Sequence, residues 1–84
     1  MESLYLTCRS LTYAQRVSRV LTAARIQNII IRTPQNMSRE GCGYAVRIVQ
    51  RALAAAMSAL AAAQLPPKRV YKPGPGGLYE EVPV

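Results

Sequence analysis

A polar, turn-rich segment, residues 33–44, interrupts an otherwise apolar chain and constrains the fold more than any other feature, because it separates two halves of similar pattern. Its last residues place Cys42 between Gly41 and Gly43. Glycine adopts backbone conformations that are closed to other residues, so the chain can turn sharply on both sides of this thiol. We therefore interpret Gly41 and Gly43 as turn-forming residues and Cys42 as a thiol presented at a turn.

The pattern of each half of the chain predicts a strand, then a helix, then a strand. In the second half the first of these strands begins directly after the turn-rich segment. Residues 4–8, 27–32, 44–48 and 68–71 are typical of short strands, although Val70 and Tyr71 are the only apolar residues of the last, and Pro34 ends the second of them. Residues 10–24 have apolar side chains at helical spacing, with Ser10 or Thr12 as the N-cap. The alanine-rich stretch 50–64 predicts a second helix whose buried stripe contains Leu53, Met57 and Leu60.

This order of elements predicts an α+β protein with the ferredoxin-like split βαβ fold (βαββαβ), a four-stranded antiparallel sheet with both helices on one face. Residues 1–72 would form this single domain, and the Pro/Gly-rich residues 73–84 a flexible C-terminal tail. In this topology the third strand lies between the first two and runs antiparallel to both. Cys8 and Cys42 should then lie at the same edge of the sheet, by which we mean the end at which the first two strands finish and the third begins, beside the N-terminus of the first helix.

Composition limits the chemistry and the partners. The 84 residues have a formal net charge of +7, which favours either anionic partners or a solvated basic surface. The chain has no His, and its two Cys alone leave a tetrahedral metal site incomplete, so we expect no metal and no cofactor. The N-terminus lacks a signal-peptide pattern, and the apolar run 52–63 is shorter than the roughly 20 residues of a membrane span. We therefore expect a cytoplasmic protein with no membrane contact.

The predicted surroundings of Cys42 favour an anionic sulfur. A helix N-terminus attracts anions, and Arg9, Arg32 and Arg39 are close to this edge in sequence. Such surroundings lower a cysteine pKa from about 8.5 into the range of roughly 3.5–7.5, and the thiolate is then a nucleophile, a metal ligand or an acceptor of a sulfur or selenium atom. For Cys8 the sequence leaves two interpretations open, a buried small apolar residue or a second thiol that cooperates with Cys42.

Several short runs carry a resemblance to a known family. They are Ala-Gln-Arg-Val in the first helix, Ile30-Ile31-Arg32-Thr33-Pro34, and the closing Arg69-Val70-Tyr71. Between them, some eight residues after Thr-Pro, a Gly-Cys-Gly sequence lies within the run Ser38-Arg39-Glu40-Gly41-Cys42-Gly43-Tyr44-Ala45-Val46-Arg47. With these runs, residues 4–71 resemble the putative selenium/sulfur carrier protein-like family of small bacterial domains. The resemblance implies that Cys42 is a carrier thiol. This thiol would form a transient persulfide or perselenide and hand the atom to a partner protein, without being an enzyme.

The sequence also departs from the pattern expected of that family, and it supports two other hypotheses. The second helix lacks acidic residues, and the tail is extra. A basic ferredoxin-like domain could instead bind nucleic acid, but no RNP1-like run is present, and only Tyr5, Tyr44 and Tyr71 are candidates to stack bases. The third hypothesis is a regulatory or oligomerisation module that associates with itself through a sheet edge or through the C-terminal tail. We favour the carrier hypothesis.

Overall fold

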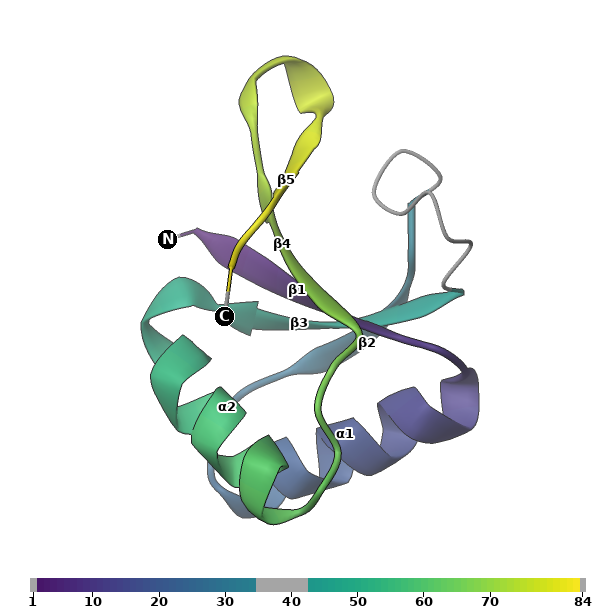
Figure 1. Ribbon diagram of the computed structural model, residues 1–84, viewed down its shortest axis with the longest axis vertical. Helices are drawn as coiled ribbons and strands as arrows, with labels where there is room; N and C mark the ends of the chain where they lie inside the picture. The colour runs from purple at the N-terminus through teal and green to yellow at the C-terminus, as the bar shows by residue number, and fades with distance from the viewer. Residues whose placement is uncertain (1, 35–42, 84) are drawn as a thin grey trace.

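The computed structural model describes residues 2–34 and 43–83, which form two α-helices and five strands. In chain order the elements are β1 (Ser3–Cys8), α1 (Leu11–Ala23), β2 (Ile29–Arg32), β3 (Tyr44–Val49), a 3₁₀ turn (Gln50–Ala52), α2 (Leu53–Ala62), β4 (Arg69–Pro73), a second 3₁₀ turn (Pro75–Gly77) and β5 (Tyr79–Glu81). The strands form one sheet in the order β2-β3-β1-β4-β5, with every neighbouring pair antiparallel (Figure 1).

The position of the third strand is confirmed. β3 lies between β1 and β2 and is antiparallel to both, and Tyr44 is the cross-strand partner of Cys8 on one side and of Arg32 on the other. The end of β1, the end of β2 and the start of β3 therefore meet at one edge of the sheet. The helix α1 also begins at this edge, and the predicted cap is confirmed because the Ser10 Oγ accepts a hydrogen bond from the Tyr13 N–H at 3.1 Å.

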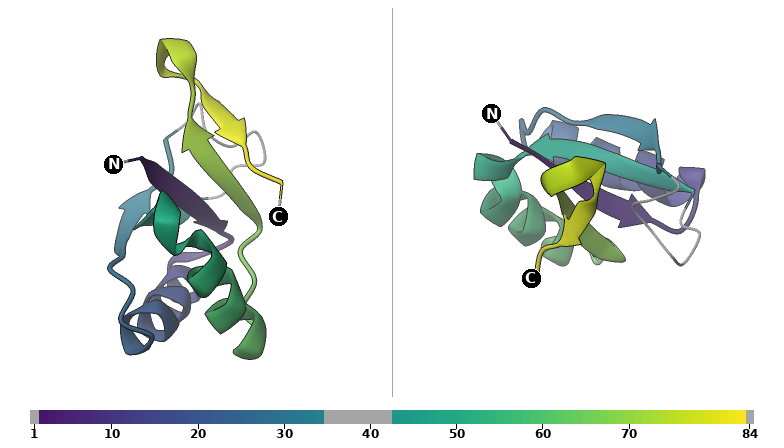
Figure 2. Two further views of the ribbon diagram at one scale, coloured as in Figure 1. Left: turned by 90° about the vertical axis from the view of Figure 1, so that its left-hand side faces the viewer. Right: turned by 90° about the horizontal axis from the view of Figure 1, so that it is seen from above.

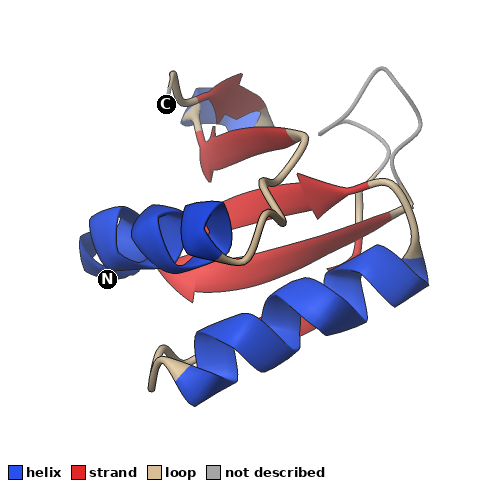
Figure 3. Cartoon of the chain, turned by 60° about the horizontal axis from the view of Figure 1, so that its bottom comes forward, coloured by secondary structure: helices blue, strands red, loops and turns tan. Residues whose placement is uncertain are grey.

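Both helices pack against the same face of the sheet (Figure 3). Side chains alternate between the two faces of a strand, so every second residue of the central strands joins the core. The buried core consists of Leu4, Leu6, Cys8, Ala14, Val17, Leu21, Val46, Ile48, Ala56, Leu60 and Val70. No described helix packs on the opposite face of the sheet, which we call the open face, although Thr7 and Ala45, toward the cysteine-bearing edge, are fully buried on it.

The second helix differs from its predicted pattern. The α-helix begins at Leu53 after a 3₁₀ turn that has no side-chain cap, and its deepest residues are Ala56 and Leu60. Leu53 and Met57, predicted as part of the buried stripe, are only partly buried. The small side chain of Ala56 lets the helix backbone approach the core closely, so the larger residues lie at the sides of the contact.

The prediction of four strands is wrong, because β5 adds a fifth. It comes from the segment assigned to a flexible tail, and β4 itself extends through Pro73 into that segment. Gly76 and Gly77 have φ of +70° and +74°, which allows the tight turn of a β4–β5 hairpin that extends away from the rest of the sheet (Figures 1 and 2). Cross-strand ion pairs join Arg69 to Glu81 at 3.1 Å and Lys72 to Glu80 at 3.8 Å. The flexibility of residues 73–84 stays a prediction.

The end of α2 offers a stabilising substitution. Gln64 has φ of +57°, in the left-handed region, and directly after it the Leu65 N–H donates to the Leu60 carbonyl at 2.9 Å. This is the position of a helix C-terminus at which glycine is preferred. We expect Gln64→Gly to raise the free energy of unfolding by about 0.5–1 kcal/mol, measured by urea titration. Ala55→Gly, at an exposed position within α2, is the control and should lower it by about 1 kcal/mol. A loss in both variants would contradict this account of Gln64.

Candidate functional site

The sheet edge at which β1 and β2 end and β3 begins is the candidate site. The Thr33 N–H donates a hydrogen bond to the Gly43 carbonyl oxygen at 3.0 Å, which holds together the chain on the two sides of residues 35–42. The next pair along these strands is Arg32 and Tyr44, and Tyr44 is in turn paired with Cys8. Gly41, Cys42 and Arg39 lie outside the described residues, so their predicted roles stay predictions.

Cys8 is part of the hydrophobic core. Its side chain is fully buried, and its Sγ donates to the Leu6 carbonyl oxygen at 3.6 Å. Because Leu4, Leu6 and Cys8 alternate along β1, all three face the helices. The structure thus agrees with the interpretation of Cys8 as a buried small apolar residue. A role as second thiol would require local opening of this edge, and it stays a prediction.

Arg9 and Arg32 lie exposed at this edge, on the two sides of Cys8 and Tyr44. The guanidinium carbon of Arg9 is 5.2 Å from the ring centroid of Tyr13, and that of Arg32 is 6.0 Å from the ring centroid of Tyr44. These distances are typical of cation–π contacts, and such a contact orients a guanidinium without neutralising its charge. Neither arginine forms an ion pair within the part of the chain that the structure describes, so both positive charges are available to an anion.

Gly43 does not have the conformation for which glycine is required. Its φ lies outside the left-handed region, and a Cβ added to it would meet no described atom within 4 Å. The turn-forming role suggested for Gly43 is therefore not visible at this residue itself.

Gly43→Ala should accordingly leave the free energy of unfolding unchanged within about 0.5 kcal/mol. Gly76→Ala is the matched control, because the left-handed φ of +70° at Gly76 is unfavourable for alanine, and it should cost about 1 kcal/mol. Thermal unfolding followed by circular dichroism compares the two variants. Equal losses would show that Gly43 has a conformational role after all.

Sequence reasoning missed one polar group of the site. The Thr33 Oγ1 is buried and has no hydrogen-bond partner among the described residues. A buried hydroxyl without a partner is unfavourable, and such groups in native proteins call for an explanation. The Thr-Pro pair marks Thr33 as the residue at the end of the β-branched strand, but nothing in the sequence indicates that its hydroxyl is buried.

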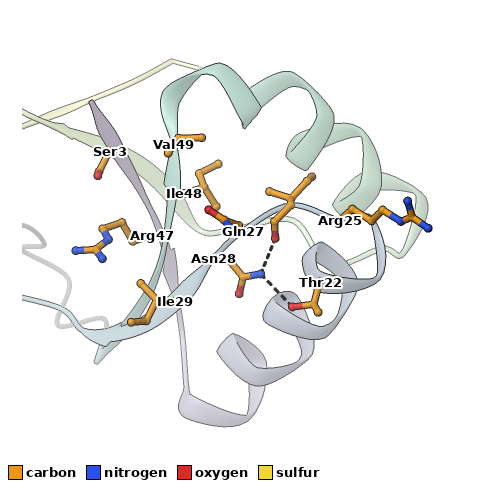
Figure 4. Close-up of a pocket in the computed structure, with 10 residues that line it drawn as sticks. Ser3, Thr22, Arg25, Gln27, Asn28, Ile29, Arg47, Ile48 and Val49 are labelled. Atoms are coloured by element: carbon orange, nitrogen blue, oxygen red, sulfur yellow. Dashed lines mark hydrogen bonds between the residues drawn. The ribbon is translucent and has the colours of Figure 1, made fainter. Parts of the chain in front are cut away.

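A cavity of about 600 Å³ lies at the opposite end of the same strands (Figure 4). Residues from the end of α1, the start of β2 and the end of β3 line it, among them Arg25, Asn28 and Arg47. The Asn28 side-chain amide donates to the Thr22 hydroxyl at 3.1 Å and to the Ile26 carbonyl at 2.9 Å, so it connects the segment that precedes β2 to the end of α1. No motif of the sequence indicated a site at this end of the sheet, and the cavity is separate from the cysteine-bearing edge.

The fold and the site together define a small basic α+β domain with two exposed arginines at the sheet edge that flanks a Gly-Cys-Gly sequence. Residues 3–72 match the family described as "Putative Se/S carrier protein-like". This match covers most of the chain, so the chain belongs to that family, as its sequence resemblance indicated. No curated protein and no solved structure matches it. None of the helices formed by the described residues is both long enough and apolar enough to cross a membrane.

Proposed function

We propose that the chain is a non-enzymatic cytoplasmic carrier of sulfur or selenium, with the Cys42 thiol as the site that holds the atom. The observation that carries this proposal is the family match over residues 3–72, which includes the Gly-Cys-Gly sequence. The geometry of the described residues supports it. The chain on both sides of residues 35–42 is held at a sheet edge where Arg9 and Arg32 are exposed.

We infer further that the domain has the ferredoxin-like fold with one added strand. The order β2-β3-β1-β4, the antiparallel pairing and the packing of both helices on one face are those of a split βαβ repeat. β5 extends this sheet beyond β4. In this fold the candidate edge is formed by the ends of β1 and β2 and by the start of β3, and β5 is at the far side of the sheet from β2.

The chemistry of loading is a transfer between two thiols. The Cys42 thiolate attacks the outer sulfur of a persulfide on a donor protein, the sulfur–sulfur bond of the donor breaks, and the donor leaves as a thiolate. The carrier then holds a Cys42 persulfide, and an acceptor takes the outer atom in the same way. A perselenide follows the same balance. The carried group is anionic, so Arg9 and Arg32 would favour the loaded form over a neutral thiol.

Intact mass spectrometry tests the proposal. After incubation with a low-molecular-weight persulfide donor, wild-type protein should gain the mass of one sulfur atom, which a reducing thiol then removes. Cys42→Ala should gain none, whereas Cys8→Ala, the matched control, should load like wild type. Loading of Cys42→Ala to the wild-type level, or no loading of wild type, would refute the carrier function.

A further inference from the structure

A row of side chains crosses the open face of the sheet, at a distance from the cysteine-bearing edge. In the strand register Ile29 is paired with Arg47, Arg47 with Tyr5, Tyr5 with Tyr71, and Tyr71 with Glu81. Directly paired residues lie on the same face of a sheet. The neighbours of Tyr5 along β1, Leu4 and Leu6, are buried beneath the helices, so this row lies on the open face.

The row combines aromatic rings with one exposed cation. Tyr5 and Tyr71 are partly exposed, and Tyr79 of β5 packs edge-on against Tyr5 with ring centroids 5.6 Å apart. Arg47 is exposed, and its side chain points away from α1 (Figure 4). At the other end of the row the Glu81 carboxylate lies 3.1 Å from the Arg69 guanidinium, which offsets its charge. The centre of this face therefore presents two neighbouring tyrosines beside a positive charge.

We propose that the open face binds single-stranded nucleic acid, with bases stacked on Tyr71 and Tyr5 and a phosphate held by Arg47. Base stacking on aromatic side chains combined with a basic surface is how proteins bind single strands without sequence preference. The net charge of +7 and the absence of any acidic residue from residues 43–79 favour such a polyanion. Tyr44, named with Tyr5 and Tyr71 as a stacking candidate, is on the helix face of the sheet and takes no part. None of the three proposed contact side chains belongs to the edge formed by Cys8, Tyr44 and Arg32, and the proposal does not depend on the carrier function.

A second copy of the chain is the competing occupant of the open face. One residue of the row would suit such a contact, and another would oppose it. Sheet faces that pack on one another bury large apolar side chains, and Ile29, which is 49% exposed, would contribute to such a contact. Arg47, however, is in the middle of the row, and a second copy would have to bury it beside aromatic rings. A single strand leaves its guanidinium in contact with phosphate and water.

Fluorescence anisotropy with a short labelled oligothymidylate tests this site. Wild type should bind at low salt, and its affinity should fall as salt rises. Tyr71→Leu keeps the apolar bulk but removes the ring, so it should weaken binding roughly tenfold, whereas Tyr71→Phe should bind like wild type. Arg47→Ala should reduce the slope of log K against log salt by about 0.7, the value for one phosphate contact on a single strand. Arg19→Ala on the exposed side of α1 removes the same charge elsewhere and should leave the slope unchanged.

Four results would overturn the proposal. The first is no binding at low salt, and the second is an equal change of the salt slope in Arg47→Ala and Arg19→Ala. The third is equal competition by an unlabelled oligothymidylate and by an abasic strand of the same length. The fourth is wild-type affinity in Tyr71→Leu. Sedimentation analysis of the same variants identifies the competing occupant, since a wild-type dimer that Tyr71→Leu dissociates would assign this face to a second copy. Circular dichroism confirms that each variant is folded. If Tyr71→Leu unfolds, Tyr71→Trp replaces it, and it should bind more tightly than wild type.

Discussion

Replacement of Leu6 by alanine is expected to lower the free energy of unfolding by about 3–5 kcal/mol. Leu6 is fully buried on the central strand β1, and its cross-strand partners are Val46 on β3 and Val70 on β4. A shorter side chain at this point leaves a cavity that touches three strands at once, and backbone pairing on both sides restrains the strand from closing it. A domain of this size has only about 4–13 kcal/mol of stability, so the variant should lose a large share of it and would be largely unfolded if the wild type lies at the lower end of this range.

Leu78→Ala is the matched control for Leu6→Ala, because it makes the same chemical change at a leucine that is 62% exposed. It should alter the free energy of unfolding by no more than about 0.5 kcal/mol. Urea titration followed by circular dichroism measures both variants against wild type. Similar losses in the two variants, or a loss below about 1 kcal/mol for Leu6→Ala, would contradict the position of Leu6 at the centre of the core.

The central part of the fold could be predicted from local patterns. Leu4 and Leu6 alternate along a short apolar run, the β-branched residues 29–31 favour a strand, and Pro34 ends it. The handedness and pairing rules of a split βαβ repeat then place β3 between β1 and β2, as the structure confirms. The strands themselves depend on residues that are close in sequence, and the general topology rule supplies their long-range pairing, which is why a single sequence reveals both.

The fifth strand could not be predicted in the same way, because it depends on contacts between distant residues. β5 has three residues and follows a segment whose composition is typical of a flexible linker. Tyr79 packs on Tyr5 of β1, and Glu81 forms an ion pair with Arg69 of β4. Neither partner can be inferred from the residues next to β5 in the sequence. The buried position of Ala56 has a similar cause, since the distance between helix and sheet decides which residue of α2 is deepest.

Part of the candidate site could be predicted from the topology, and part of it depends on tertiary contacts that the sequence does not reveal. The common edge of β1, β2 and β3 followed from topology, and the structure confirms it through the pairs that Tyr44 makes with Cys8 and Arg32. The burial of Cys8 was left open, although its position two residues after Leu6 is the alternation that places a side chain on the core face. The Thr33 hydroxyl was missed because burial of a single polar atom is a tertiary property.

Alkylation of the native protein by iodoacetamide is expected to modify Cys42 and to leave Cys8 at least about 100-fold slower to react. Cys8 is fully buried in the core, so the reagent reaches it only when the edge opens, and an opening free energy of about 3 kcal/mol already gives this factor. Cys42 follows a polar, turn-rich sequence, and the described edge from which this segment starts has two exposed arginines, so we expect its thiolate to be favoured. Mass spectrometry of timed samples gives the rate for each thiol separately.

Two single-cysteine variants allow the alkylation rate of each thiol to be measured without the other. Cys42→Ala retains only Cys8 and should react slowly in the native state, then at the rate of an ordinary thiol in denaturant. Cys8→Ala retains only Cys42, and its rate should level off as pH rises through a pKa below the ordinary value of about 8.5, because the thiolate is the reacting form. A native-state rate for Cys8 close to that of Cys42 would contradict its burial. A rate for Cys42 that still rises steeply above pH 8 would instead show that Arg9, Arg32 and Arg39 do not stabilise its thiolate.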